Sequence, residues 1–182
     1  ITGGCGMLGI EYARALSAAG ATVFLLDVLP RKKIDAHIEK YAGEFRGNVF
    51  GVHVDITDER SVRDAAARVF KERGRIDILI NNAALTDVSG KKNRFAPYEE
   101  FPLDLWREEL DVSLTGAFVV TKAVIPYMKE QKSGVIVNVS SIYGIVGADN
   151  RIYEKGKYRS IAYSAAKSGT LNFARALASY LA

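Results

Sequence analysis

The sequence predicts an α/β fold, a doubly wound parallel sheet in three α/β/α layers, and three observations support this. Short apolar runs alternate with longer helical patterns through residue 139, as strands and helices do in such folds. A glycine-rich turn leads into the first helical pattern. Polar residues that suit a binding site follow the apolar runs, and the carboxyl ends of parallel strands are where such sheets bind ligands.

The elements can be placed from these patterns. Strands are expected at residues 21–26, 48–54, 76–80 and 134–139, where the runs are short, apolar and partly β-branched. Helices are expected from the glycine turn through Ala19, at 34–45, 59–73 and 103–131, with a last helix from Tyr163 onward. The chain starts against the glycine turn and stops within this last helix. We therefore expect one nucleotide-binding domain over residues 1–182, truncated at both ends.

The glycine turn and the next strand suit a dinucleotide. Glycines at positions 3, 6 and 9 permit a tight turn, close approach of a phosphate and close packing of the following helix, whose N-terminus favours a pyrophosphate. Asp27 ends the next strand, where a carboxylate accepts hydrogen bonds from an adenosine ribose and repels the extra phosphate of NADP. NAD is therefore predicted as the cofactor, with NADP less favoured. The expected contacts in the turn are Gly3, Gly6, Met7, Leu8 and Gly9.

Two further strand ends extend the expected cofactor site. Asp55 and Ile56 follow the second predicted strand, and the Asp55 carboxylate either reaches an adenine or caps the next helix. Asn82, Ala83 and Ala84 follow the third, where small residues leave room for a flat ring against the backbone. Cys5, within the turn, is interpreted as a small filler, the alternative being a thiolate at a helix N-terminus.

The strongest chemical pattern is Tyr163 with Lys167, which opens the last helix. Residues four apart lie on one helical face, so the two side chains should point the same way. An ammonium beside a phenol favours the phenolate, which allows the tyrosine to exchange a proton with a substrate oxygen. Ser141 follows the fourth predicted strand and is expected to donate a hydrogen bond to that oxygen.

Together these residues resemble the short-chain dehydrogenase/reductase family over essentially the whole chain. The resemblance rests on the glycine turn, the Asn81-Asn82-Ala83 stretch, Ser141, and Tyr163 with Lys167. It implies a Rossmann fold, a nicotinamide cofactor, Tyr163 as acid/base, Lys167 on the nicotinamide ribose and Ser141 on the substrate oxygen. The family usually carries an asparagine that supports a proton-relay water where this chain has Ser113, whose hydroxyl has a shorter reach.

The resemblance and the residues lead to a functional hypothesis. We expect an oxidoreductase that interconverts a secondary alcohol and a ketone, with Ser141, Tyr143, Arg151 and Tyr153 as candidate substrate contacts. Basic residues at 91–94 and 151–159, and a glycine spacing like that of nucleotide-sugar-modifying relatives, favour a polar or anionic, sugar-like substrate. The long stretch between Ser141 and Tyr163 also resembles oxidoreductases of bacterial surface-sugar and flagellin-modification pathways.

Two alternatives belong to other functional classes. A nucleotide-sugar epimerase or dehydratase would keep its NAD bound and show no net NADH formation. A non-catalytic NAD-binding protein would retain its function when Tyr163 is replaced by phenylalanine.

Composition restricts the partners. The net charge of +4 is too mild to indicate nucleic acid, and one cysteine excludes an internal disulfide. No run of side chains has metal-ligand spacing, and no uncharged apolar run suggests a membrane span, so we expect neither a metal nor a membrane partner. We expect a cytoplasmic protein that forms a homodimer or homotetramer, since family members commonly pair through the long helix and the helix after Tyr163.

Overall fold

The computed structural model describes residues 1–85 and 94–182, so Lys91, Lys92 and Asn93 of the expected basic patch lie outside the described residues. The chain divides into two compact units. The first unit contains Ile1–Ala83 and Phe118–Val137, and the second contains Ala84–Ala117 and Asn138–Ala182. Each unit is described by itself.

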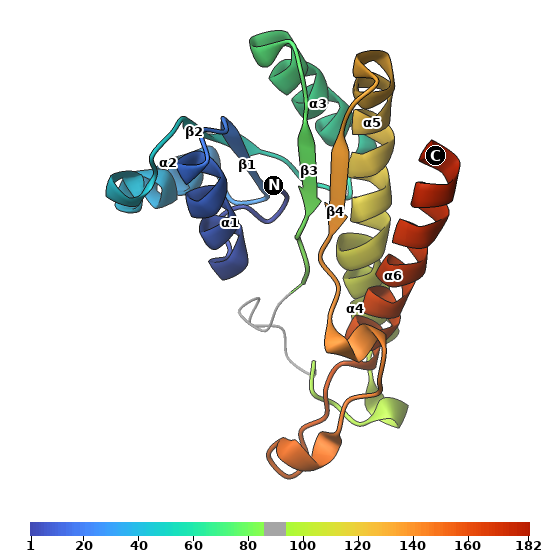
Figure 1. The fold of residues 1–182 in the computed structure, drawn as a ribbon. Coiled ribbons are helices and arrows are strands. Elements are labelled where there is room, and N and C mark those ends of the chain that lie inside the picture. The colour runs from blue at the N-terminus through green and yellow to red at the C-terminus, as the bar shows by residue number, and fades with distance from the viewer. Residues whose placement is uncertain (86–93) are drawn as a thin grey trace. The chain divides into compact units, whose positions relative to one another are not determined.

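The first unit has the alternating strands and helices that the sequence predicts (Figure 1). Its elements are α1 (Met7–Ala18), β1 (Val23–Asp27), α2 (Arg31–Lys40), β2 (Val49–His53), α3 (Glu59–Arg73), β3 (Ile78–Asn81), most of α5 (Gly116–Gln131) and most of β4 (Val135–Asn138). Strands β1 and β2 pair in parallel, from Val23 opposite Val49 to Asp27 opposite His53. Strands β3 and β4 form a second two-stranded sheet. The α/β fold class with parallel strands is therefore confirmed.

Two helices have bounds that differ from the prediction. Helix α6 begins at Ile161 rather than at Tyr163. Helix α2 spans Arg31–Lys40 rather than 34–45, and Pro30 precedes its first residue. The first turn is charged and exposed, and Arg31 pairs with Asp35 one turn on at 2.8 Å. Apolar periodicity therefore detected only the turn that begins with the buried Ile34.

Apolar packing stabilises the first unit around two groups of side chains. Ile10, Ala13, Val23 and Leu25 form a buried cluster between α1 and β1. Helices α3 and α5 pack together through the stacked rings of Phe70 and Tyr127, whose centroids are 4.4 Å apart.

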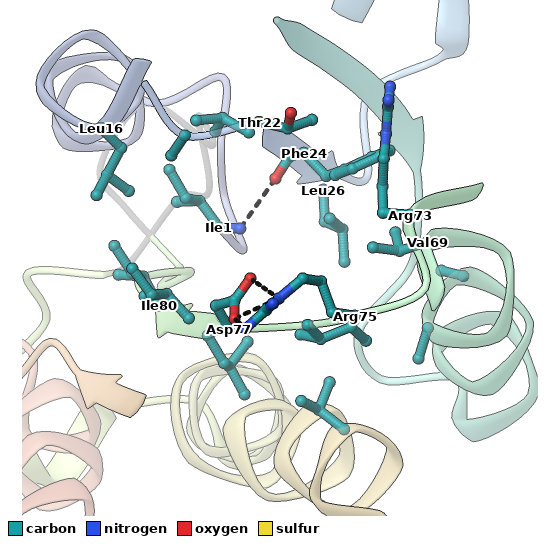
Figure 2. A pocket seen from close by; sticks show the side chains of 18 of the residues that line it. Ile1, Leu16, Thr22, Phe24, Leu26, Val69, Arg73, Arg75, Asp77 and Ile80 are labelled. Atoms are coloured by element: carbon teal, nitrogen blue, oxygen red, sulfur yellow. Dashed lines mark hydrogen bonds and ion pairs between the residues drawn. The ribbon is translucent and has the colours of Figure 1, made fainter. Parts of the chain in front are cut away.

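A cavity of about 390 Å³ lies between the two sheets of the first unit. Figure 2 shows its apolar walls, with Phe24 and Leu26 of β1 on one side and Ile80 of β3 on the other. Thr2 connects the two sheets, because its N–H donates to Ile80 O at 3.0 Å and it forms a parallel bridge with Leu26. The glycine turn is thus hydrogen-bonded to both strands.

The second unit is built mainly from helices. It contains α4 (Leu103–Leu110), a π-helical turn (Asp111–Thr115) and α6 (Ile161–Leu181), and α6 packs against the other two. Short 3₁₀ turns lie at Tyr98–Glu100, Ile142–Gly144 and Asn150–Ile152. The predicted helix 103–131 is confirmed as a continuous helical run, but the π turn interrupts its regular spacing at Ser113.

Among the residues that the structure describes, Leu103–Gln131 is the one helix long and apolar enough to span a membrane by length and composition. It carries the fully buried carboxylate Glu109, and its Lys122 pairs with Glu59 of α3 at 2.7 Å. A buried carboxylate such as that of Glu109 is typical of a helix packed against other parts of a protein.

Candidate active site

The glycine turn is held in shape by backbone contacts that no other residue would allow. Gly3 has φ of +59°, and a Cβ on it would lie 2.9 Å from Ala83 Cα. A Cβ on Gly9 would lie 2.5 Å from Gly3 O, so α1 packs directly on the turn. Gly4 was not singled out from the sequence, yet its Cβ would lie 2.7 Å from Leu25 Cα, which places the turn against β1.

The N-terminus of α1 is open. Gly6 is its N-cap, and no side chain caps the helix by a hydrogen bond. The Met7 and Leu8 side chains are 83% and 46% exposed, respectively. The turn therefore presents N–H groups and the positive end of a helix dipole, as a phosphate site requires.

Asn82 and Ala83 hold the turn from the end of β3. The Asn82 amide donates to Thr2 O at 3.0 Å and to Gly3 O at 3.1 Å. The backbone N–H groups of Asn82 and Ala83 donate to the Thr2 hydroxyl at 3.0 and 3.1 Å. The buried Thr2 side chain is thus part of the site, and sequence reasoning did not assign it this role. Its partners lie some eighty positions along the chain, so no local pattern identified it.

Asp27 lies at the end of β1, as predicted, and its carboxylate accepts hydrogen bonds from Cys5 N at 3.0 Å and Leu29 N at 3.2 Å. Burial and the nearby Asp27 charge raise the pKa of the Cys5 thiol to about 12. Cys5 is buried in the turn, which agrees with its interpretation as a small filler rather than with the thiolate alternative.

The Asp55 carboxylate forms hydrogen bonds with a residue two positions along the chain. Its Oδ1 accepts hydrogen bonds from the N–H and the hydroxyl of Thr57 at 2.9 and 2.6 Å, while the helix cap of α3 is Asp58. Ile56 is buried and Ala84 is half-buried. Contacts of Asp55, Ile56 and Ala84 with a cofactor stay predictions.

Lys167 and Tyr163 lie on one face of α6, as their spacing predicts. Lys167 is 3% exposed, and its Nζ donates to Val139 O at 2.6 Å. The same Nζ lies 5.8 Å from the centroid of the Tyr163 ring. Burial lowers the pKa of the Lys167 ammonium below its ordinary value. An ammonium and a phenol are therefore fixed beside each other.

The turn that carries Ser141 packs against α6 at Lys167. Ser140 Oγ donates to Lys167 O at 2.9 Å, and Ser168 Oγ donates to Gly144 O at 2.8 Å. A Cβ on Gly144 would lie 2.7 Å from Lys167 O, so the approach is as close as two backbones allow. The Ser141 hydroxyl accepts from Tyr143 N at 3.2 Å, and its own proton can be donated elsewhere.

Two further aromatic residues and one arginine extend this group. The hydroxyls of Tyr143 and Tyr153 are 2.8 Å apart. The Arg159 guanidinium lies 4.2 Å from the centroid of the Tyr163 ring and 5.8 Å from that of Tyr143. By contrast, the predicted substrate contact Arg151 is 90% exposed and is paired with Asp149 at 2.8 Å. The structure brings Arg159 to the candidate catalytic residue Tyr163, which the sequence alone did not indicate.

A buried polar network fixes the start of α6. The N-cap Ser160 accepts from Tyr163 N at 3.2 Å and donates to Glu109 Oε2 at 2.5 Å. Glu109 is fully buried and also pairs with the buried Arg94 at 2.7 Å, and Arg94 donates to Leu85 O at 2.8 Å. Sequence analysis missed this network. A serine before an apolar helix is a recognisable cap signal, but nothing local indicates its distant carboxylate partner.

Ser113 is 3% exposed in the π-helical turn, and its hydroxyl accepts from Leu85 N at 3.3 Å. Single π turns in α-helices often occur at functional sites. A role for Ser113 in proton transfer stays a prediction.

Within residues 1–85 and 94–182, no group of three His, Cys, Asp or Glu side chains could hold a metal ion.

Comparisons with known proteins agree with these features. The model of the short chain dehydrogenase family matches residues 1–182. The chain is 36% identical over 162 residues to the uncharacterized oxidoreductase YxjF of Bacillus subtilis, a match that covers 87% of this chain and 58% of YxjF. It is 34% identical over 178 residues to the cis-4-hydroxycyclohexanecarboxylate dehydrogenase of Sinomonas cyclohexanicum, covering 98% of this chain and 64% of that enzyme.

A solved structure gives the same result at the level of the fold. The crystal structure of an NAD⁺-bound xylitol dehydrogenase aligns with a TM-score of 0.80 at 29% identity, covering 99% of this chain and 63% of that one. The chain thus spans about three fifths of the length of these relatives.

Proposed function

Because the chain belongs to the short-chain dehydrogenase/reductase family, we propose that it is an NAD(H)-dependent oxidoreductase that interconverts a secondary alcohol and a ketone. The observation that carries this proposal is the grouping of Ser141, Tyr163 and Lys167 on α6 and on the turn packed against it. These residues supply a hydroxyl donor, a phenol and an ammonium, which suit proton exchange with a substrate oxygen.

The residues have distinct parts in this reaction. A bound nicotinamide supplies the hydride chemistry. Tyr163 Oη takes the proton of the substrate hydroxyl during oxidation and returns it during reduction. Lys167, held on Val139 O, keeps a positive charge beside the phenol when that proton has been transferred. Ser141 donates a hydrogen bond to the substrate oxygen and so holds it in place for the transfer.

The glycine turn fits a dinucleotide. Its backbone is too close to Ala83 and to α1 for any side chain at Gly3 or Gly9, while the α1 N-terminus is open at Gly6. This is the arrangement of fixed N–H donors that a pyrophosphate needs. We propose NAD rather than NADP because the Asp27 carboxylate beside the turn favours ribose hydroxyls and repels a second phosphate.

The proposed substrate is polar or anionic and sugar-like. One observation favouring an anion is the guanidinium of Arg159 next to Tyr163. The name of the Sinomonas relative also describes a secondary alcohol and a carboxylate on one ring. This makes 4-hydroxycyclohexanecarboxylate a reasonable first assay substrate.

We also propose that the protein forms homodimers or homotetramers through α6. Apolar side chains of this helix at Leu171, Phe173 and Leu177 are only half-buried. A partner copy would cover them. Size-exclusion chromatography with light scattering tests this, and a strictly monomeric full-length protein would contradict it.

The test of the enzymatic proposal uses the full-length protein, alcohol substrates and either NAD or NADP, with NADH or NADPH absorbance as the readout. Tyr163→Phe should lower the rate about 10²- to 10⁴-fold while calorimetry shows unchanged NAD binding. Tyr180→Phe, an exposed tyrosine on the same helix, is the matched control and should retain full activity.

The outcomes separate the functional classes. Net NADH formation that depends on Tyr163 supports the dehydrogenase. Turnover of a nucleotide sugar with no net NADH indicates an epimerase or dehydratase, and unchanged biological function in Tyr163→Phe indicates a non-catalytic NAD-binding protein.

A further inference from the structure

Two buried charges of the second unit have no part in the proposed reaction. The Arg94 and Glu109 side chains are 2% and 0% exposed, and Arg94 Nη2 lies 2.7 Å from Glu109 Oε1. Taking two charges out of water costs free energy that their mutual attraction offsets only in good geometry, so a buried pair is weak evidence of a stabilising role. Such a pair can instead specify one arrangement of the groups around it, and its other hydrogen bonds show which groups these are.

The Glu109 carboxylate determines which way the Ser160 hydroxyl points. An ionised carboxylate only accepts hydrogen bonds, so Ser160 donates its one proton to Glu109 Oε2, which lies 2.5 Å from Ser160 Oγ. The lone pairs of Ser160 Oγ then remain for accepting, and Tyr163 N donates to this oxygen at 3.2 Å. The ion pair therefore keeps Ser160 as an acceptor at the N-terminus of α6.

This hydrogen bond acts on the residue whose phenol is proposed to exchange the proton. Tyr163 lies in the first turn of α6, where backbone N–H groups have no partner within the helix and depend on the cap. The other end of the network is also fixed, because Arg94 donates to Leu85 O at 2.8 Å. We propose that Glu109 is a positioning residue, which sets the place of Tyr163 through Ser160. This assignment rests on the proposed function, since it takes the Tyr163 phenol as the group that exchanges the proton.

A variant that keeps the fold but loses both buried charges separates positioning from stability. Arg94→Met with Glu109→Leu in the full-length protein should retain much of the stability, because apolar side chains replace both members of the ion pair. The Ser160 hydroxyl then loses the carboxylate that orients it. The kcat with 4-hydroxycyclohexanecarboxylate and NAD should therefore fall about 10- to 100-fold. The KM and the calorimetric Kd for NAD should change little, because a displaced phenol slows the transfer rather than the binding.

Replacement of the cap itself gives a second, independent comparison. Ser160→Ala should lower kcat in the same way, whereas Ser160→Thr keeps the hydroxyl and should retain most of the rate. Asp58→Ala is the matched control: Asp58 caps α3 by accepting from Arg60 N at 2.9 Å, so the variant loses a comparable cap and should keep its kcat. Amide hydrogen exchange at Tyr163 reports on the cap without turnover, and it should be faster in Ser160→Ala and in the double variant.

Two results would overturn the assignment. One is a folded double variant that keeps both the full kcat and the slow exchange at Tyr163. The other is an equal fall of kcat in Ser160→Ala and Asp58→Ala, because it would show that the rate follows helix stability alone. If exchange at Tyr163 rises as expected but the unchanged protein forms no NADH, the hold of Glu109 on Tyr163 is supported and the proposed function fails.

Discussion

The buried network at the start of α6 gives a sharp prediction for Glu109→Gln. The substitution keeps the size of the side chain but removes the charge that is paired with Arg94, and both side chains are almost fully buried. It also weakens the hydrogen bond that the Ser160 hydroxyl donates to Glu109, and the same hydroxyl caps α6 by accepting from Tyr163 N. The change therefore acts on the helix that carries Tyr163 and Lys167.

The expected size follows from the loss of a buried ion pair. Leaving one buried charge without its partner costs about 3–5 kcal/mol. For a chain of this length each kcal/mol lowers the Tm by about 2–4 °C, so the Tm should fall by about 6–20 °C. Below the lowered Tm, NADH formation should also slow, because a less rigid N-cap places the Tyr163 phenol less accurately.

The assay is thermal unfolding followed by circular dichroism, together with the rate of NADH formation well below the Tm. Glu100→Gln is the matched control, since Glu100 is exposed and the same substitution there should change the Tm by about 1 °C or less. The double variant Arg94→Met with Glu109→Leu removes both charges and should recover much of the stability. A Tm for Glu109→Gln equal to that of Glu100→Gln would refute the reasoning.

Three further predictions concern single positions. Gly9→Ala forces a Cβ to within 2.5 Å of Gly3 O and should weaken NAD binding at least about 10-fold, whereas Gly43→Ala, with open space around it, should leave calorimetric NAD binding unchanged. Native Cys5 should resist iodoacetamide at about pH 8.5 and react once the protein is unfolded in urea, because its pKa is raised to about 12; rapid native alkylation would show the opposite. The folded pKa of Lys167 lies below the unfolded value of 10.5, so the burial cost of its charge is present at neutral pH and is relieved as the pH rises through the folded pKa. Lys167→Met has no such charge, so its free energy of unfolding should not change with pH in this way. The free energy of unfolding of Lys167→Met relative to that of the unchanged protein should therefore decrease as the pH rises toward 10.5. Urea titrations that show a constant difference would contradict this.

The sequence by itself determined the features that depend only on neighbouring residues, such as helix ends and side-chain spacing along a helix. Helix α3 spans Glu59–Arg73 and is stopped by Gly74, as the pattern predicts, and the φ of +73° at Gly74 is one that only glycine adopts readily. The spacing of Tyr163 and Lys167 places them on one face of α6 because a helix repeats every 3.6 residues. Gly3, Gly6 and Gly9 of the turn were likewise identified from their spacing alone.

Tertiary structure decided which polar groups meet across long stretches of chain. Asn82 donates its amide to the glycine turn eighty positions earlier, and Ser160 reaches Glu109 fifty-one positions away. Arg151 and Arg159 have the same side chain and lie on the same loop, yet one is paired in solvent with Asp149 and the other is stacked on Tyr163. Periodicity and cap signals depend only on neighbouring residues, whereas these pairings depend on how the folded backbone brings distant segments together.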